Sequence, residues 1–252
     1  MTSSENRNGI RILIAGGGTG GHLYPALAIA EEIRRQNPDA EFLFVGTHKK
    51  IEEKVVPSFG FKFKTIWISG FHRKVIISNL LFPLKVVVSF IQSLILILQF
   101  RPNVAVGTGG YVCGPILYTA SFLRIPVLLH ESNSYPGITT KLLASRATRI
   151  FLGFEAAKKY LKNNASFEVV GTPVRQNLNS ASRQQALECF GLSSEKKIVL
   201  AFGGSQGAAS INQAIAIGLD SGKCKDFQFI WQTGNNDYGI HKRYIRDRKS
   251  VV

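Results

Sequence analysis

Three glycine-rich turns, each following a short apolar run, constrain the fold of this chain more than any other feature. They are GGGTGGH at 16–22, GTGG at 107–110 and GGSQGA at 203–208. Glycine lets the backbone approach a ligand closely, and a helix that starts at such a turn directs free N–H groups and a partial positive charge outward. Three such turns, spread over two halves of the chain, predict a protein that holds phosphate-bearing ligands.

Strand-like and helix-like segments alternate along the chain. The expected strands cover 10–15, 41–45, 63–68, 104–106, 126–130, 149–152, 168–170, 197–202 and 227–231, and the expected helices cover 25–36, 79–100, 115–123, 139–144, 182–190 and 210–219. Strands joined by helical crossovers form a parallel sheet covered on both faces, so the predicted fold class is α/β. The pattern restarts at GTPVR (171–175), which predicts a first domain over 1–170 and a second over 171–252.

Composition narrows the class of protein. The chain has 252 residues, of which 45% are hydrophobic and 19% charged, as in a globular protein. Its three cysteines, Cys113, Cys189 and Cys224, form no CxxC pair, which argues against a disulfide framework or a zinc site and fits a reducing cytosol. The polar N-terminus leads into a first strand rather than a signal peptide.

The net charge of +15 is unevenly placed, beside the most apolar part of the chain. No acidic residue lies between Glu53 and Glu131, whereas lysine and arginine recur there on both sides of the apolar stretch 80–100. The uncharged run after Lys85 is shorter than the ~20 residues that a bilayer span needs, so a transmembrane helix is not expected. Two alternatives stay open: a buried helix with solvated basic flanks, or a helix resting on an anionic membrane surface. Nucleic acid is not an expected partner, because the basic residues lack interleaved aromatics.

The first turn fits a dinucleotide fingerprint only in part. Gly16, Gly18 and Gly21 satisfy GxGxxG, but that motif needs an acidic residue at the end of the second strand, which here ends in Gly46-Thr47. No GKS or GKT follows, which excludes a P-loop. A nicotinamide cofactor is therefore not expected.

Several polar residues at strand ends are candidates for chemistry. His22 begins the helix after the first turn, where the helix dipole disfavours imidazolium; it could accept a proton, or it could merely pack the turn. Glu131 follows a buried strand and could act as a base or accept hydrogen bonds from sugar hydroxyls, and Asn133 could donate and accept.

The second part of the chain offers further candidates. Arg175 could meet a diphosphate or pair with a surface carboxylate. Ser205 and Gln206 lie in the third turn, where a hydroxyl and an amide can supplement backbone N–H donors.

Six motifs together resemble one family. GGGTGGHLYPALA (16–28), GTGGYVCGP (107–115), HESNSYPG (130–137), GTPVR (171–175), GGSQGA (203–208) and WQTG (231–234) occur in the order found in the MurG family of bacterial N-acetylglucosaminyltransferases. The resemblance implies a glycosyltransferase-B fold, with two Rossmann-like domains facing a cleft. It implies transfer of N-acetylglucosamine from UDP-N-acetylglucosamine to the C4 hydroxyl of undecaprenyl-pyrophosphoryl-muramoyl-pentapeptide, with inversion.

The resemblance also implies a place in the cell and a set of site residues. Family members act in peptidoglycan synthesis, and so in cell shape and division, as peripheral proteins on the cytoplasmic face of the membrane. Thr19, Gly20, Gly21, Asn133, Arg175, Ser205 and Gln206 match positions that bind the UDP-sugar. The first two turns, with His22, Gly109, Gly110 and Tyr111, resemble the side that receives the lipid acceptor and its diphosphate. His22 is the first candidate for general base and Glu131 the second. No cofactor or metal is implied, because backbone N–H groups and helix ends can stabilise the leaving UDP.

Two departures from the family pattern carry their own expectations. Thr140 stands where the family commonly has asparagine, which could alter one contact. The family continues well beyond the motif at 231–234, into a region that reads the uracil and the ribose, so we expect an exposed apolar sheet face, weak UDP-sugar binding and little turnover. The alternatives are a transferase acting on another lipid such as diacylglycerol, and a membrane- and acceptor-binding module without a usable donor site.

Overall fold

The computed structural model describes residues 9–70, 81–161, 166–175, 181–204 and 207–244, and it divides into two compact units. Unit 1 comprises Met1–Gln176 and unit 2 comprises Asn177–Val252. The division falls a few residues after the expected boundary at 170, so the GTPVR segment belongs to unit 1.

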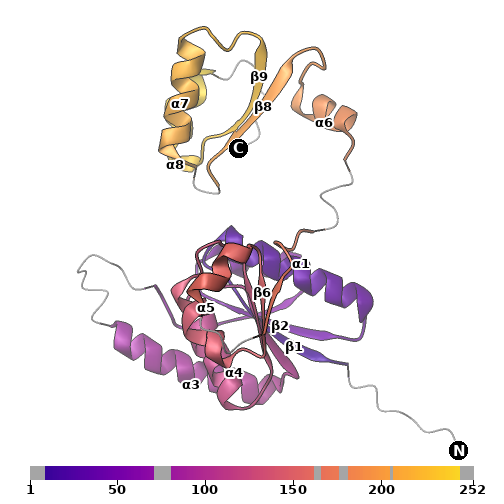
Figure 1. The fold of residues 1–252 in the computed structure, drawn as a ribbon, viewed down its shortest axis with the longest axis vertical. Helices are drawn as coiled ribbons and strands as arrows, with labels where there is room; N and C mark the ends of the chain where they lie inside the picture. The colour runs from indigo at the N-terminus through magenta and orange to yellow at the C-terminus, as the bar shows by residue number, and fades with distance from the viewer. Residues whose placement is uncertain (1–8, 71–80, 162–165, 176–180, 205–206, 245–252) are drawn as a thin grey trace, which may run out of the picture. The chain divides into compact units, whose positions relative to one another are not determined.

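Unit 1 is built on one seven-stranded sheet (Figure 1). Its spatial order is β3-β2-β1-β4-β5-β6-β7, and every neighbouring pair is parallel. The predicted parallel α/β sheet is thereby confirmed, and its first four strands follow the Rossmann order. The strands are β1 (Arg11–Ala15), β2 (Glu41–Gly46), β3 (Lys62–Thr65), β4 (Val104–Gly107), β5 (Val127–Glu131), β6 (Arg149–Leu152) and β7 (Ser166–Val169).

Alternate side chains of the central strands enter two separate cores. Leu13 and Ala15 of β1 lie in a core completed by helices α3, α4 and α5, whereas Ile12 and Ile14 lie in a core completed by α1 and α2. The sheet is therefore covered on both faces, as the apolar runs in its strands predict. The helices of unit 1 are α1 (Gly20–Gln36), α2 (Ile51–Ser58), α3 (Phe82–Phe100), α4 (Cys113–Phe122) and α5 (Ile138–Leu143), with 3-10 turns η2 (Ala144–Arg146) and η3 (Glu155–Tyr160).

Two helices of unit 1 differ from the sequence-based expectation. α1 begins at Gly20, five residues before the expected start at Pro25, because the glycines after Thr19 let the helix start at the turn itself. α2 was not predicted at all, since its sequence IEEKVVPS is short and ends in a proline and a serine. Both differences matter for the site, because α1 and α2 each begin at the carboxyl edge of the sheet.

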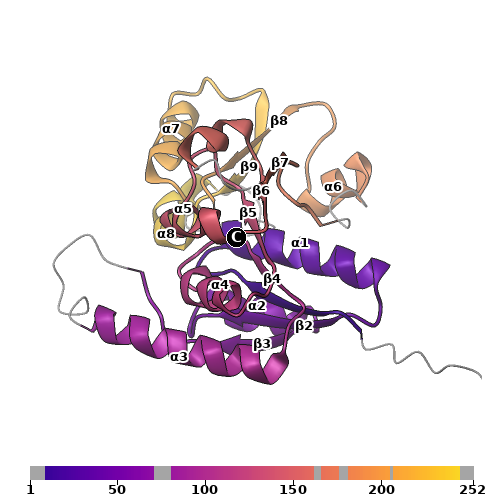
Figure 2. The same ribbon diagram turned by 60° about the horizontal axis from the view of Figure 1, so that its bottom comes forward.

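Helix α3 presents an unusual surface. Ser89, Ser93 and Ile97 form its buried side, and the two serine hydroxyls donate to backbone carbonyls one turn earlier in the same helix. Large apolar residues on the other sides are 39–57% exposed: Leu84, Val87, Ile91, Leu94, Ile95 and Leu98. Figure 2 shows this helix along the outside of unit 1. The alternative of a buried helix is therefore wrong.

The expectation that no helix spans a membrane needs a qualification. In the described part of the chain, α3 is long and apolar enough, by length and composition alone, to cross a bilayer. The packing of its serine side against α4, where Phe90 meets Tyr118 edge-on at 5.6 Å, favours a helix that stays on the surface of unit 1.

Unit 2 contains a two-stranded parallel sheet and three helices among its described residues. Leu200 and Phe202 of β8 are 62% and 60% exposed, as expected for a sheet with one uncovered face. Asn212 is fully buried, and its side chain connects α7 to β9 and α8 by hydrogen bonds. It accepts from Trp231 Nε1 and donates to Thr233 O and Asp237 Oδ2. The elements are α6 (Arg183–Phe190), β8 (Lys197–Phe202), α7 (Ala209–Asp220), β9 (Phe227–Gln232) and α8 (Asn235–His241), with the 3-10 turn η5 (Lys242–Tyr244).

Candidate functional site

The first two glycine turns lie side by side at the carboxyl edge of the sheet in unit 1. They follow the neighbouring strands β1 and β4, whose last residues, Ala15 and Gly107, are register partners. Loops at this edge of a parallel sheet are the usual place for ligand binding. The structure thus brings together two turns that lie 91 positions apart in the sequence (16 to 107).

His22 connects the two turns. Its Nδ1 lies 3.0 Å from the carbonyl oxygen of Thr108, and the Thr108 hydroxyl donates to the carbonyl oxygen of His22 at 2.7 Å. Because a carbonyl can only accept, Nδ1 carries the hydrogen in this arrangement. In the neutral ring Nε2 then keeps its lone pair, which is the tautomer that a general base requires.

The glycines of the second turn are required by close packing. Gly109 and Gly110 have φ of +111° and +91°, a conformation that side chains rarely adopt. A Cβ atom on Gly109 would lie 2.5 Å from the Nδ1 atom of His22, and one on Gly110 would lie 2.5 Å from the carbonyl oxygen of Gly17. Any side chain at these two positions would separate the turns.

The start of α1 offers hydrogen-bond donors. Thr19 is the N-cap residue, but its hydroxyl makes no capping bond, and no acidic residue occupies the first turn of the helix. Within the described residues, the N–H groups of Thr19, Gly20 and Gly21 have no hydrogen-bond partner. Free N–H groups at the N-terminus of a 17-residue helix form a typical site for a phosphate.

Glu131 is buried, and both of its carboxylate oxygens are occupied. Oε1 accepts from the backbone and side-chain nitrogens of Asn133 at 3.0 and 2.8 Å, and Oε2 accepts from Gly137 N at 3.0 Å and Thr140 Oγ1 at 2.7 Å. A carboxylate with four donors holds its loop in shape, so this geometry favours a positioning role for Glu131 over that of a base. Thr140, the departure from the family pattern, supplies one of these donors.

His130 ties the end of β5 to the segment that leaves unit 1. Its Nε2 lies 3.0 Å from the carbonyl oxygen of Gly171, and burial lowers the pKa of the imidazole below its usual value. An imidazole with a lowered pKa binds its proton less readily in the folded protein than in the unfolded chain. Folding stability is therefore lost as the pH falls below the ordinary histidine pKa.

This pH dependence leads to a testable prediction. We expect the free energy of unfolding of the wild type to fall more steeply than that of His130→Gln between about pH 7 and 5, because glutamine can keep the bond to Gly171 without titrating. Urea denaturation across this range measures the difference. Parallel pH dependence in the two proteins would contradict the assignment.

The remaining predicted residues lie in different surroundings. The guanidinium of Arg175 lies 5.2 Å from the ring centre of Tyr24 and 5.6 Å from that of Phe59, and no ion pair is formed by it within the described residues. Tyr111 is 58% exposed beside the second turn, and its ring fills the space next to Gly70. Ser205 and Gln206 lie outside the described residues.

The described part of the third turn also requires glycine. Gly207 has φ of +77°, and a Cβ atom there would lie 2.0 Å from the carbonyl oxygen of Thr233. The turn leads directly into α7, whose N-terminus begins at Ala209. Unit 2 therefore offers its own helix N-terminus for an anion.

Two residues that support the turns were not predicted. Cys113 donates its S–H to the carbonyl oxygens of Ala15 and Gly109, both at 3.1 Å, and burial raises the pKa of its thiol to about 12. Glu52 on α2 reaches the first turn with a buried carboxylate. Nothing in the sequence distinguishes Glu52 from the neighbouring Glu53, because contacts across 34 positions leave no local pattern.

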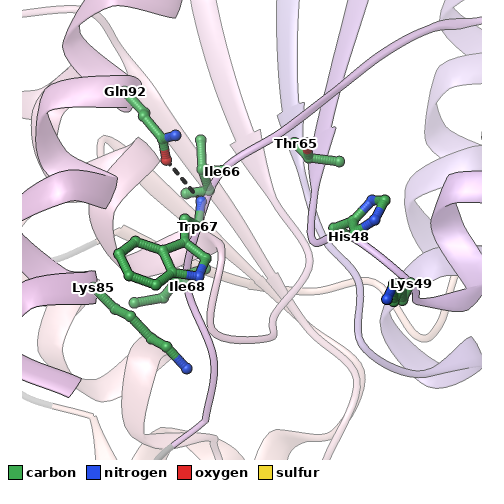
Figure 3. A pocket seen from close by; sticks show the side chains of 8 residues that line it. All are labelled: His48, Lys49, Thr65, Ile66, Trp67, Ile68, Lys85 and Gln92. Atoms are coloured by element: carbon green, nitrogen blue, oxygen red, sulfur yellow. Dashed lines mark hydrogen bonds between the residues drawn. The ribbon is translucent and has the colours of Figure 1, made fainter. Parts of the chain in front are cut away.

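A hollow of about 340 Å³ lies beside α3, and none of the residues that line it belongs to a glycine turn (Figure 3). The backbone N–H of Trp67 donates to Gln92 Oε1 at 2.7 Å, and Lys85 Nζ lies 3.0 Å from Ser69 Oγ and 5.9 Å from the Trp67 ring centre. The residues that line it are His48, Lys49, Thr65, Ile66, Trp67, Ile68, Lys85 and Gln92. Three basic side chains and an indole thus line a hollow to which α3 contributes Lys85 and Gln92.

No three histidine, cysteine, aspartate or glutamate side chains lie close enough to hold a metal ion in the residues that the structure describes.

Comparison with known proteins places this site in a family. The model of the glycosyltransferase family 28 N-terminal domain matches residues 12–152, which is more than half of the chain. The UDP-N-acetylglucosamine--N-acetylmuramyl-(pentapeptide) pyrophosphoryl-undecaprenol N-acetylglucosamine transferase of Clostridioides difficile is 41% identical over 240 residues, covering 94% of this chain and 59% of that protein. The protein of the same name from Bacteroides fragilis is 43% identical, covering 93% of this chain and 63% of its own length.

A solved structure of a protein from the same family has a similar fold. The crystal structure of MurG from Acinetobacter baumannii aligns with a TM-score of 0.64 at 23% identity, covering 93% of this chain and 61% of that one. The chain therefore spans about three fifths of the length of these proteins. The resemblance to the MurG transferases is confirmed, and the chain belongs to glycosyltransferase family 28.

Proposed function

We propose that this chain takes part in transferring N-acetylglucosamine from UDP-N-acetylglucosamine to an undecaprenyl-pyrophosphate-linked muramoyl pentapeptide. The observation that carries the proposal is the pairing of the first two glycine turns through His22, in which Nδ1 faces the carbonyl oxygen of Thr108 and Nε2 is the ring nitrogen left to accept a proton. The names of the relatives supply the two substrates.

The geometry fits the steps of such a reaction. The free N–H groups of Thr19, Gly20 and Gly21 bind a diphosphate, and His22 Nε2 takes the proton of the attacking C4 hydroxyl. The hydroxyl oxygen forms a bond to C1 of N-acetylglucosamine while the bond from C1 to UDP breaks, and UDP leaves with the electron pair. Attack from the face opposite UDP inverts the anomeric centre.

The other predicted site residues bind or position the two substrates of this reaction. Asn133 and Arg175 bind the donor, as do Ser205 and Gln206 of the third turn together with the N-terminus of α7. Gly109, Gly110 and Tyr111 lie on the acceptor side. Glu131 positions Asn133 through the two hydrogen bonds to it.

A single-turnover assay tests this function. The chain in excess is mixed with labelled UDP-N-acetylglucosamine and a vesicle-bound polyprenyl-pyrophosphoryl muramoyl peptide, so that even slow transfer is detected. Labelled disaccharide lipid is the expected product, and diacylglycerol vesicles serve as the control acceptor. Labelled diacylglycerol without disaccharide lipid would identify a different lipid transferase.

We further propose that unit 1 binds the cytoplasmic face of the bacterial membrane through α3. Leu84, Val87 and Ile91 form an exposed apolar stripe on this helix, and Lys85 and Lys49 line the basic hollow beside it. An apolar helix face flanked by basic side chains binds anionic lipid by burying its apolar side chains and attracting headgroups.

The membrane contact makes a second prediction. The variant Leu84→Gln, Val87→Gln, Ile91→Gln should lose most of its co-sedimentation with phosphatidylglycerol vesicles, by about tenfold or more, because each apolar side chain contributes roughly 1 kcal/mol or more. The control variant Ile138→Gln, Leu142→Gln changes apolar residues on α5 that are even more exposed, and it should bind as the wild type does. Equal losses in both variants would show that α3 is not the membrane contact.

A further inference from the structure

Glu52 is the least expected ionisable group in the site. It is fully buried at the start of α2, and the proposed reaction does not use it. Its Oε2 accepts from the backbone N–H of Gly18 at 3.0 Å, and its Oε1 accepts from the N–H and the hydroxyl of Thr47 at 3.1 and 2.9 Å. One carboxylate thus joins the first glycine turn to the end of β2.

Two glycines leave the space that the Glu52 side chain occupies. A Cβ atom on Gly17 would lie 2.5 Å from Glu52 Oε1, and one on Gly46 would lie 2.6 Å from Glu52 Cγ. Among the ion pairs formed within the described residues, none includes Glu52. A buried carboxylate is costly unless hydrogen bonds satisfy it, and here three donors do so.

We propose that Glu52 is a positioning residue that sets the first turn for diphosphate binding, an inference that rests on the proposed function. The Glu52 carboxylate accepts from the N–H of Gly18 and so holds that N–H toward α2. Gly18 itself has φ of +83°. Thr19 follows in extended conformation, and α1 starts at Gly20. The N–H groups of Thr19, Gly20 and Gly21 then stay without a partner among the described residues and are free to bind the ligand.

Whether removal of the Glu52 carboxylate weakens or tightens diphosphate binding distinguishes a positioning role from a purely electrostatic one. A negative charge below the turn repels a bound diphosphate, so removing it should tighten binding if charge alone mattered. Removing it should weaken binding if the carboxylate holds the N–H groups in place. The two explanations therefore predict opposite changes in affinity.

Calorimetric titration of the full chain provides the test. The probes are farnesyl diphosphate and UDP-N-acetylglucosamine, which carry a diphosphate from the acceptor and the donor side respectively. We expect Glu52→Ala to weaken binding of the diphosphate held by the first turn at least about tenfold, and Glu52→Gln to weaken it less, because an amide oxygen can still accept from Gly18. Weakening for farnesyl diphosphate alone would assign the turn to the acceptor, and weakening for the nucleotide sugar alone would assign it to the donor.

Two further variants control the experiment. Glu53→Gln removes a charge from the adjacent residue, which pairs with His48 and Lys49 N instead, and it should change affinity by less than about twofold. Gly46→Ala leaves the charge in place but pushes against Glu52 Cγ and the Phe63 ring, and it should weaken binding as Glu52→Ala does. The amide resonances of residues 18–21 should shift in the Glu52 variants without ligand, while those of α4 stay in place.

The results of these titrations distinguish a failure of the positioning role of Glu52 from a failure of the proposed function. Equal or tighter binding by the Glu52 variants, or unmoved amide resonances at 18–21, would overturn the positioning role and leave the proposed function standing. If the wild type bound neither diphosphate, the proposed function would fail, and the role of Glu52 with it. If the Glu52 variants lost their overall fold, Gly46→Ala would decide, and wild-type affinity in that variant would overturn the inference.

Discussion

His22→Ala is expected to lower the single-turnover rate of N-acetylglucosamine transfer by about 100-fold or more, the usual contribution of a general base. The reason is that His22 Nδ1 donates to the carbonyl oxygen of Thr108, so Nε2 is the ring nitrogen whose lone pair is free to accept the proton. Binding of the diphosphate held by the first turn should change little, because backbone N–H groups hold that ligand. The loss should therefore appear in the rate at saturating acceptor.

His48→Ala is the matched control for this prediction. His48 lies at the same edge of the sheet but is exposed and pairs with Glu53 at 2.6 Å. Its removal should leave the rate within about twofold of the wild type. A His22→Ala variant that transfers at nearly the wild-type rate with saturating acceptor would show that another group takes the proton.

Gly110→Ala is expected to lower the transfer rate by about 100-fold as well, since displacements of about 1 Å at a reacting centre have effects of this size. The added Cβ atom would lie 2.5 Å from the carbonyl oxygen of Gly17, so the two turns must move apart. The φ of +91° adds a backbone strain of about 1–3 kcal/mol. Thermal denaturation and the transfer assay measure the two consequences separately.

Gly60→Ala distinguishes strain from separation of the turns. Gly60 also has a positive φ, of +75°, but the nearest atom to an added Cβ there is 3.9 Å away, at the end of the Arg34 side chain. This variant should lose stability and keep its transfer rate. If Gly110→Ala behaved in the same way, contact between the turns would not matter for the reaction.

The sheet and the turns could be predicted from the sequence because their signals are local. Runs such as Ile12 to Ala15 are apolar on both faces of a strand, and the glycines that follow mark each turn within a few residues. The end of each strand then places His22, Glu131 and Tyr111 at one edge of the sheet. The seven parallel strands confirm this part of the prediction.

Features that depend on contacts between distant parts of the chain, or on the exact shape of a loop, could not be predicted. Glu52 looks like a surface residue in IEEKVVPS, yet its partners are Gly18 and Thr47. The four donors around Glu131 come from residues two to nine positions away, and their convergence depends on how the loop folds. Hydrophobicity also could not show that α3 buries its serines and exposes its leucines.

The central claim is that the paired turns of unit 1 bind a diphosphate, and amide chemical-shift mapping tests it most directly. The wild-type chain is titrated separately with farnesyl diphosphate and with UDP-N-acetylglucosamine while the resonances of the N–H groups are followed. We predict the largest shifts at Thr19, Gly20 and Gly21, with smaller shifts at Gly109 and Gly110. Saturable binding of both diphosphates with shifts that fall elsewhere, or no shift at these residues with either ligand at any concentration, would contradict the account.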